Sequence, residues 1–290
     1  MYALSAIMDG IIRGSFFADL ISDNAGSAIS FYEDYNCHVD QCHFLRCKST
    51  GSGVGGCVSM IGVIMKVTTS TFEECEGHVG AAAFEKGSES NFLNLSICLK
   101  CSSRFEHIFC QNTGYSTAFL CNVSFCSSIK AAPSIQSYRG PRYHYSCLLF
   151  CSNDADVGYI PHCLVKEEME TERLCMGNQT VRTALMYYQE GIHLLRGCVF
   201  VDETIVGVLF ITPADKVTLV NCWFRIPQME ESRIHVQSCS VIGDKEDRTR
   251  LLKDRCAFTQ KSTAFTKEKD TIPALAVFLV FHPLQISQVP

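Results

Sequence analysis

A six-residue motif that recurs at a nearly constant interval places the strongest constraint on how this chain folds. Each copy has Ser or Cys first, an apolar residue third and Cys sixth. Five copies lie between residues 42 and 151, and the spacing of their last residues is 28, 26, 25 and 25. A fixed period in this range is typical of a repeat protein. The five copies run from Cys42 to Cys47, Ser70 to Cys75, Ser96 to Cys101, Cys121 to Cys126 and Ser146 to Cys151.

Incomplete copies of the motif continue the period on both sides. One precedes the five, two follow them, and a degraded copy fills the gap near residue 177. Together the nine copies predict about nine turns of a regular coil. The incomplete copies run from Ser15 to Leu20, Glu172 to Gly177, Cys198 to Glu203 and Cys222 to Pro227.

The residues around the motif predict strands and tight corners. A β-branched or apolar segment comes before it, as in 217–220, and a Gly-containing corner such as Gly55-Gly56 comes after it. No 3.6-residue periodicity and no leucine-rich repeat pattern is present, which excludes the helical and leucine-rich repeat classes. We therefore expect an all-β, single-stranded right-handed parallel β-helix. Phe17, Phe44 and Phe72 should stack on one another inside it.

The 18 cysteines allow three interpretations. An even count suggests disulfides in an oxidising compartment, whereas the shared phase suggests a ladder of small, apolar, reduced thiols inside the coil. Metal binding is the third alternative. We expect the ladder, because Cys98 and Cys101, the lone CxxC pair, both already have positions in it. The Cys-His pairs near residues 37–47 match no common zinc spacing.

Charge and hydropathy argue against nucleic-acid binding and against a membrane-spanning segment. The formal net charge is −5, so there is no basic footprint for nucleic acid. The longest apolar run, 272–281, is too short to span a bilayer, and Asp9 and Arg13 interrupt the apolar N-terminal stretch, so neither a membrane span nor a secretory leader is expected. Residues 1–230 should form the coil. Residues 231–290 should form a less regular, partly helical cap or tail, with a short helix over 248–258.

Acidic residues do not predict an active site. No Asp lies between Asp40 and Asp154, and Asp154 and Asp156 fall in an expected loop. The densest acidic group, Glu73, Glu74 and Glu76, is expected to face solvent. We therefore name no catalytic, cofactor-binding or metal-binding residue. Three N-x-S/T glycosylation motifs begin at Asn94, Asn122 and Asn178.

The motif Cys/Ser-x-Phe-x-x-Cys, followed by Gly55-Gly56-Cys57-Val58, resembles the β-helix repeats of the polymorphic outer membrane proteins. It is especially similar to their expanded, Cys-rich relatives in parasitic protists. The resemblance covers roughly residues 10–230. It implies a pectin-lyase-like solenoid, often displayed at a cell surface and used in adhesion. This chain departs from the family in lacking a visible leader and membrane span.

Function is expected to follow from a surface rather than a catalytic centre. The leading hypothesis is a non-enzymatic scaffold that binds a carbohydrate or protein on one lateral face, with no cofactor. The turns between residues 126 and 198 vary most, so the ligand face is expected there. A carbohydrate-active enzyme with an atypical site is the alternative, and an inactive fragment of an expanded family is another. Convergence of three or more carboxylates in one groove would favour the enzyme. The sequence does not specify the oligomeric state.

Overall fold

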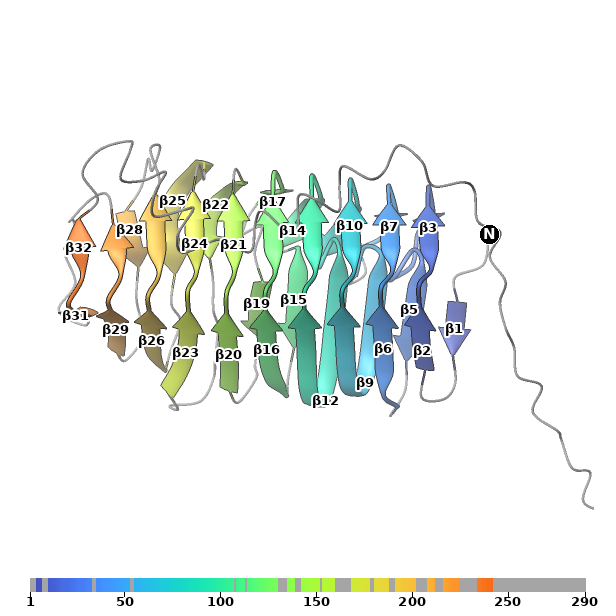
Figure 1. Ribbon diagram of the computed structural model, residues 1–290. Coiled ribbons are helices and arrows are strands. Elements are labelled where there is room, and N and C mark those ends of the chain that lie inside the picture. Colours follow the sequence, from blue (N-terminus) through green and yellow to red (C-terminus); the bar gives the residue numbers. More distant parts are fainter. Residues whose placement is uncertain are drawn as a thin grey trace, which may run out of the picture.

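The computed structural model is an all-β solenoid built from parallel strands (Figure 1). This confirms the predicted fold class, and the right-handed sense of the coil stays a prediction. None of the described residues is helical. The structure describes residues 4–6, 10–32, 35–52, 55–106, 108–112, 114–129, 135–138, 142–151, 153–159, 168–177, 180–187, 191–201, 208–211, 216–224 and 234–241.

Three sheets run along the coil axis, and each pairs strands from successive turns in parallel. Sheet 1 has 14 strands, sheet 2 has 10 and sheet 3 has 8. Sheet 1 comprises β1 (Leu4–Ala6), β2 (Gly10–Arg13), β5 (Ile29–Tyr32), β6 (Cys37–Asp40), β9 (Val58–Thr68), β12 (Ala83–Asn94), β15 (Phe109–Asn112), β16 (Tyr115–Phe119), β19 (Ile135–Tyr138), β20 (Arg142–Ser146), β23 (Glu168–Glu172), β26 (Ile192–Arg196), β29 (Lys216–Val220) and β31 (Ile234–Gln237).

The strands of sheet 2 are two or three residues long, because a corner follows each of them, whereas those of sheet 3 vary in length. Sheet 2 comprises β3 (Phe16–Ala18), β7 (His43–Leu45), β10 (Thr71–Glu73), β13 (Ile97–Leu99), β17 (Asn122–Ser124), β21 (Leu149–Cys151), β24 (Cys175–Gly177), β27 (Val199–Val201), β30 (Trp223–Phe224) and β32 (Ser240–Val241). Sheet 3 comprises β4 (Ile21–Ser22), β8 (Lys48–Ser49), β11 (Glu76–Val79), β14 (Ser102–Glu106), β18 (Ser127–Ser128), β22 (Asp154–Tyr159), β25 (Thr180–Tyr187) and β28 (Val208–Ile211).

The third residue of the motif points inward from the middle of each sheet 2 strand. Register places Phe17, Phe44 and Phe72 on consecutive turns. Their rings stack at centroid distances of 5.0 and 4.7 Å, nearly parallel, as expected. The same column continues through Cys98 and Val123. The motif therefore records a real side-chain column that fills the interior.

The first and last residues of the motif are chosen by hydrogen bonding to the backbone. Ser70 and Ser96 each donate to the carbonyl two residues earlier, and Cys121 makes the same contact with sulfur. At the sixth position, Cys75 Sγ and Cys101 Sγ donate to carbonyls of the preceding turn at 3.6 Å. A small side chain with one donor satisfies the buried carbonyl and fills the corner without crowding it.

Each corner needs one residue with a positive φ angle. Before the sixth position of the motif, Arg46, Glu74 and Lys100 all have φ between 51° and 55°. The corner that leads back to sheet 1 uses Gly instead, at Gly26 and Gly55. A Cβ on Gly26 would meet the carbonyl oxygen of Ile29 at 2.1 Å, so this corner requires glycine.

The fifth copy of the motif is shifted by two residues from its predicted position. Phe150, rather than Leu148, pairs with Val123, so Cys151 takes the position of Ser124 and lies outside the cysteine column. The column continues instead with buried Asn153, whose Oδ1 accepts from the backbone N–H of Cys126 at 2.8 Å. The prediction that Cys151 stacks with the other four cysteines was wrong.

The sixth copy is shifted in the same way. Met176 pairs with Phe150 and is fully buried, so the copy begins at Leu174 and not at Glu172. A shift of two preserves the alternation of inward and outward side chains, which is why the sequence pattern did not reveal it.

Three other predictions concern the later part of the chain. Asp154 and Asp156 lie in β22 and not in a loop. Strands β31 and β32 extend sheets 1 and 2 past residue 230, where the boundary of the coil was expected. The predicted helix over 248–258 lies outside the described residues.

Replacing Phe72 by Asp should destabilise the protein strongly. Phe72 is fully buried, stacked on Phe44 and edge-on to Phe109 at 5.4 Å, so the carboxylate would have no partner. We expect a loss of at least ~3 kcal/mol in the free energy of unfolding, measured by urea denaturation. Thr71→Asp, one residue earlier and facing outward, should cost less than ~1 kcal/mol. Equal losses for the two variants would contradict the inward column.

Cys75→Ser should be tolerated better than Cys75→Leu. Serine keeps the donor to the carbonyl of Glu73, now 3.4 Å from Cys75 Sγ, whereas leucine loses it and crowds the corner. We expect costs of about 1 kcal/mol for serine and about 2–3 kcal/mol for leucine. Thermal unfolding of both variants measures the difference, and a reversed order would refute volume and hydrogen bonding as the determinants of this position.

Candidate functional site

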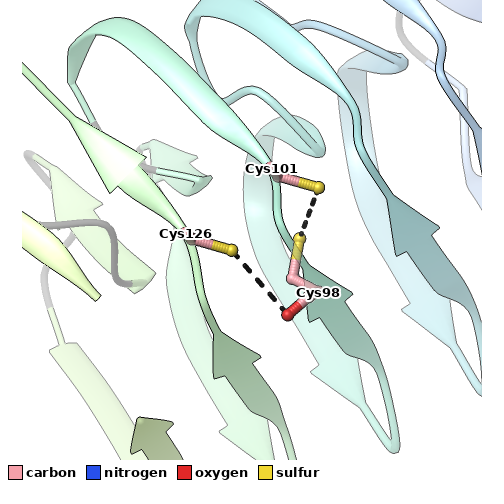
Figure 2. A group of neighbouring side chains, drawn as sticks. All are labelled: Cys98, Cys101 and Cys126. Carbon is pink, nitrogen blue, oxygen red and sulfur yellow. Dashed lines mark hydrogen bonds between the residues drawn. The ribbon is translucent and has the colours of Figure 1, made fainter. Parts of the chain in front are cut away.

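Three buried thiols lie close together at the corner between sheet 2 and sheet 3, in two consecutive turns of the coil. Cys98 comes from the middle of β13, Cys101 follows the same strand, and Cys126 follows β17 (Figure 2). Their sulfur atoms all lie within 4.8 Å of one another, and Cys98 Sγ lies 3.4 Å from Cys101 Sγ. At most 1% of each residue is exposed. We call this group the three-thiol cluster.

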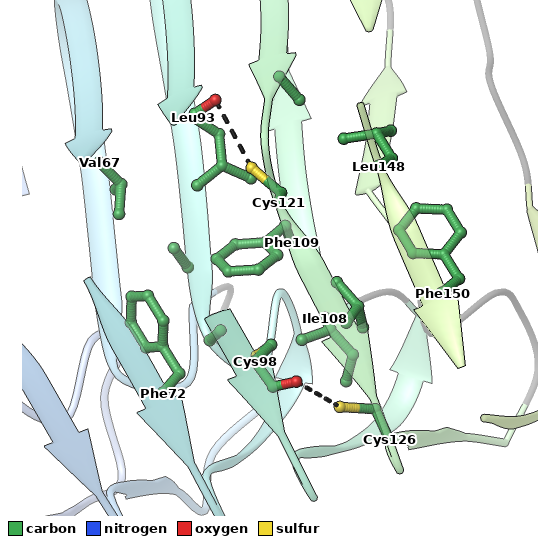
Figure 3. Packing of buried hydrophobic residues seen from close by; sticks show 14 of the residues in the cluster. Val67, Phe72, Leu93, Cys98, Ile108, Phe109, Cys121, Cys126, Leu148 and Phe150 are labelled. Carbon is green, nitrogen blue, oxygen red and sulfur yellow. Dashed lines mark hydrogen bonds between the residues drawn. The ribbon is translucent and has the colours of Figure 1, made fainter. Parts of the chain in front are cut away.

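The cluster exists because Cys98 occupies the inward column that holds Phe72 one turn earlier. The smaller side chain leaves room beside the corner, and Phe109 and Ile108 pack nearby in the interior (Figure 3). Other thiols lie close to it. Cys75 contacts Cys101, and Cys57 contacts both Cys75 and Cys47.

The protons of the three-thiol cluster are not equivalent. Burial raises the pKa of Cys98 well above its usual range. Burial also acts to raise the pKa of Cys126, but thiol donors from Cys101 and Cys98 outweigh it and lower this pKa to about 5. Hydrogen bonds from neighbouring thiols favour the charged form of Cys126, whereas burial disfavours the charged form of Cys98.

Within the described ranges, fourteen cysteines are in the thiol form and not disulfide-bonded, and thirteen of these are buried. Cys175 is disulfide-bonded, and its partner is not among these fourteen. Most of the described cysteines are therefore thiols, and the column expected from the motif spacing contains Cys47, Cys75, Cys101 and Cys126.

A second set of buried polar side chains forms a hydrogen-bonded chain between strands of sheet 1. Glu85, 1% exposed, accepts a hydrogen bond from Gln111 Nε2 at 3.1 Å, and Tyr145 donates to Gln111 Oε1 at 3.3 Å. Burial raises the pKa of Glu85 to about 8, opposed by the hydrogen bond from Gln111. The other carboxyl oxygen has no hydrogen-bond partner. Glu85 therefore stays protonated at neutral pH.

Carboxylates on the outside pair with cations of the neighbouring turn. Glu76 lies between Lys48 and Arg104, and these two contacts lower its pKa against the opposing effect of burial, which is larger than either. Within the described ranges, no set of three or more carboxylates or histidines lies close enough to share a metal ion. The cross-turn pairs are Arg13–Asp40, Arg46–Asp19, Lys48–Glu76, Lys100–Glu74, Arg104–Glu76, Arg182–Asp154 and Arg196–Glu170, at 2.6–3.3 Å.

An aromatic patch lies on the outer face of sheet 1. Tyr115 and Phe119 in β16 are 56% and 42% exposed and alternate with the buried Ser116 and Ala118. Half-buried Phe92 in β12 pairs with Thr117, which lies between them on the same face. We call Phe92, Tyr115 and Phe119 the aromatic patch. Sequence reasoning missed it, although the alternation of aromatic and small residues in 115–119 was visible.

The turns between 126 and 198, where a ligand face was predicted, carry a shallow hollow among their described residues. It is lined by Ser127, Ser128, Ile129, Asp154 and Arg182. Arg182 and Asp154 form an ion pair at 2.8 Å across it, so the charges satisfy each other. The hollow is therefore a weaker candidate than the aromatic patch.

Two of the three glycosylation motifs are described. Asn122 lies at an outward position of β17, but its Oδ1 accepts a hydrogen bond from Ser124 in the same motif. In the other, Asn94 ends β12 and Ser96 is fully buried. Asn178 lies outside the described residues.

Comparison with known proteins adds no relative: no protein-family model, curated protein or solved structure matches this chain. None of the described residues forms a helix that could cross a membrane.

Stability should fall as pH rises because of Glu85. Its pKa is raised in the folded protein, so the folded state holds a proton that the unfolded chain has lost between about pH 4.5 and 8. The stabilising contribution is complete below pH ~4.5 and is lost as pH rises to ~8, with a slope approaching 1.4 kcal/mol per pH unit. Urea denaturation across this range measures it.

Glu85→Gln should remove this pH dependence, because the amide does not titrate. Glu89→Gln on the same strand serves as the control, since Glu89 is exposed and should leave the slope unchanged. A slope that survives in Glu85→Gln would show that another group titrates.

Proposed function

We propose that this protein is a non-enzymatic β-helix scaffold that binds an extended ligand on the outer face of sheet 1. The aromatic patch carries the proposal. Exposed aromatic side chains gathered on one face mark interaction surfaces, because their burial gains more free energy than that of other side chains. Tyr115 is 56% exposed and Phe119 is 42% exposed, whereas the side chains on the inward face of the same strand are buried.

A polysaccharide chain fits this surface best. The patch has flat rings separated by polar side chains, with Thr117 between the rings and Asn94 at the end of the neighbouring strand. Sugar rings present apolar faces and a rim of hydroxyl groups, which match rings and hydrogen-bonding side chains respectively. The parallel turns would let an extended chain follow the coil axis.

Cation pairing of the carboxylates favours a scaffold over the alternative carbohydrate-active enzyme. Glycoside hydrolysis needs two carboxyl groups that flank one bond, one of them with a raised pKa. Among the described residues, the carboxyl group with a raised pKa is Glu85, which is buried inside the coil and unable to meet a polymer. The resemblance to surface-displayed, adhesive β-helix repeats is consistent with this proposal.

Binding to a panel of soluble polysaccharides tests the proposal. Pectin, xylan and a soluble cellulose derivative would be titrated in affinity electrophoresis, with the chain length of the polysaccharide measured afterwards. We expect at least one to bind uncleaved, and Tyr115→Ser/Phe119→Ser to weaken binding roughly tenfold or more.

The matched control is Phe16→Ser/Phe125→Ser, which removes two aromatic rings that are 54% and 61% exposed but lie outside the patch. This variant should bind as the wild type does. Shortened polysaccharide would favour the enzyme, whereas absence of binding, or equal loss in the control, would contradict the proposed surface.

A further inference from the structure

We propose that the three-thiol cluster of Cys98, Cys101 and Cys126 binds one soft monovalent metal ion, of which Cu(I) is the biological example. Metal–sulfur bonds of ~2.3 Å hold two ligand sulfurs ~3.8 Å apart in tetrahedral and ~4.0 Å apart in trigonal geometry. The sulfur atoms here lie 3.4 Å apart for Cys98 and Cys101, and no pair exceeds 4.8 Å. Small side-chain rotations would therefore place an ion between all three.

The cluster is more than a section of the cysteine ladder. At Cys47 and Cys75 the column supplies one thiol per turn, and Cys57 lies beside them, but these three sulfur atoms do not all lie within 4.8 Å of one another. Cys98 adds a second thiol in its turn, from a column otherwise filled by phenylalanine and valine in the neighbouring turns. Its thiol donates to the sulfur of Cys101, whereas the ladder thiols donate to carbonyl oxygens. The third ligand site therefore depends on Cys98.

Ligand number and type favour Cu(I) over zinc. Thiolates are soft ligands that select Cu(I) and zinc, and structural zinc sites almost always have four ligands. Among the described residues, three sulfur atoms lie within 4.8 Å of one another here, and Cys75 lies near Cys101 without belonging to that group. A three-coordinate Cu(I) ion needs no fourth ligand.

Charge balance points the same way. The site is dry, so binding must not leave a net charge. A monovalent ion that replaces one thiol proton leaves one thiolate and two neutral thiols: the ion bonds to sulfur, one proton leaves to solvent, and no electron is transferred. The carbonyl oxygens of Phe72 and Cys98, which accept from Cys101 and Cys126, also favour a positive ion nearby.

Burial sets when the ion enters. At most 1% of each ligand residue is exposed, so an ion reaches the site while the coil forms or opens locally. Binding then couples to folding, and the ion stabilises the folded chain over the unfolded one. The test therefore includes refolding.

The experiment uses Cu(I), delivered without oxygen to the full chain during refolding, in competition with a chromogenic Cu(I) chelator. Cys98→Val removes one ligand and takes its replacement from Val123 at the same column position. Cys121→Ser is the matched control, since Cys121 is equally buried and serine fills the same motif position in Ser70 and Ser96. Circular dichroism checks that both variants fold.

We expect one tightly held Cu(I) per chain in wild type and in Cys121→Ser, sulfur-only coordination by X-ray absorption, and a raised melting temperature. In Cys98→Val, affinity should fall more than about 100-fold, beyond the loss typical when a residue that only contacts a metal ligand is replaced, and the melting shift should disappear. Equal retention by folded Cys98→Val, or nitrogen and oxygen ligands in the spectrum, would overturn the site. If Cys98→Val does not fold, Cys126→Ser in the same assay decides the question by the same criteria.

Discussion

The structure depends on the parallel register of successive turns. When each strand pairs in parallel with its equivalent one turn later, every side chain sits directly above a side chain of the same sequence position, and each position must suit a whole column. Phe17, Phe44 and Phe72 stack for this reason. The same rule assigns the corners, where Arg46 and Glu74 adopt positive φ angles in consecutive turns. Interior packing, corner geometry and cross-turn ion pairs are consequences of one alignment.

Because the columns are so regular, a sequence period was enough to predict the coil, its inward aromatic stack and most of its thiol ladder. The prediction failed in the turn of Phe150, where two candidate copies of the motif overlap two residues apart. Both copies place apolar residues inward. The copy that ends at Cys151 matched the motif better because its sixth residue is Cys, but it is not the one that the structure uses. The choice depends on which side chain completes the interior column beside Val123, and Phe150 does so. Packing between turns, which the period does not encode, decides this register.

The candidate sites were harder to predict for a related reason. A motif describes one turn, whereas the three-thiol cluster is made by two, with Cys98 and Cys101 in one turn and Cys126 in the next. The CxxC spacing was visible, but the approach of the third sulfur depends on Cys98 replacing an aromatic ring. The aromatic patch likewise needs the pairing of β12 with β16. Glu85 could not be placed at all, since only three dimensions show that its side chain points inward.

The most direct test of the column arrangement is a crystal structure with sulfur anomalous scattering, because it locates each cysteine without relying on the chain trace. We predict four sulfur peaks, from Cys47, Cys75, Cys101 and Cys126, in one row at the ~4.8 Å spacing of stacked parallel strands. The Cys98 sulfur should lie beside the row, and the next position along it should hold Asn153 and no sulfur. Peaks dispersed through the molecule, or a fifth peak from Cys151 in line with the four, would contradict the register on which the structure depends.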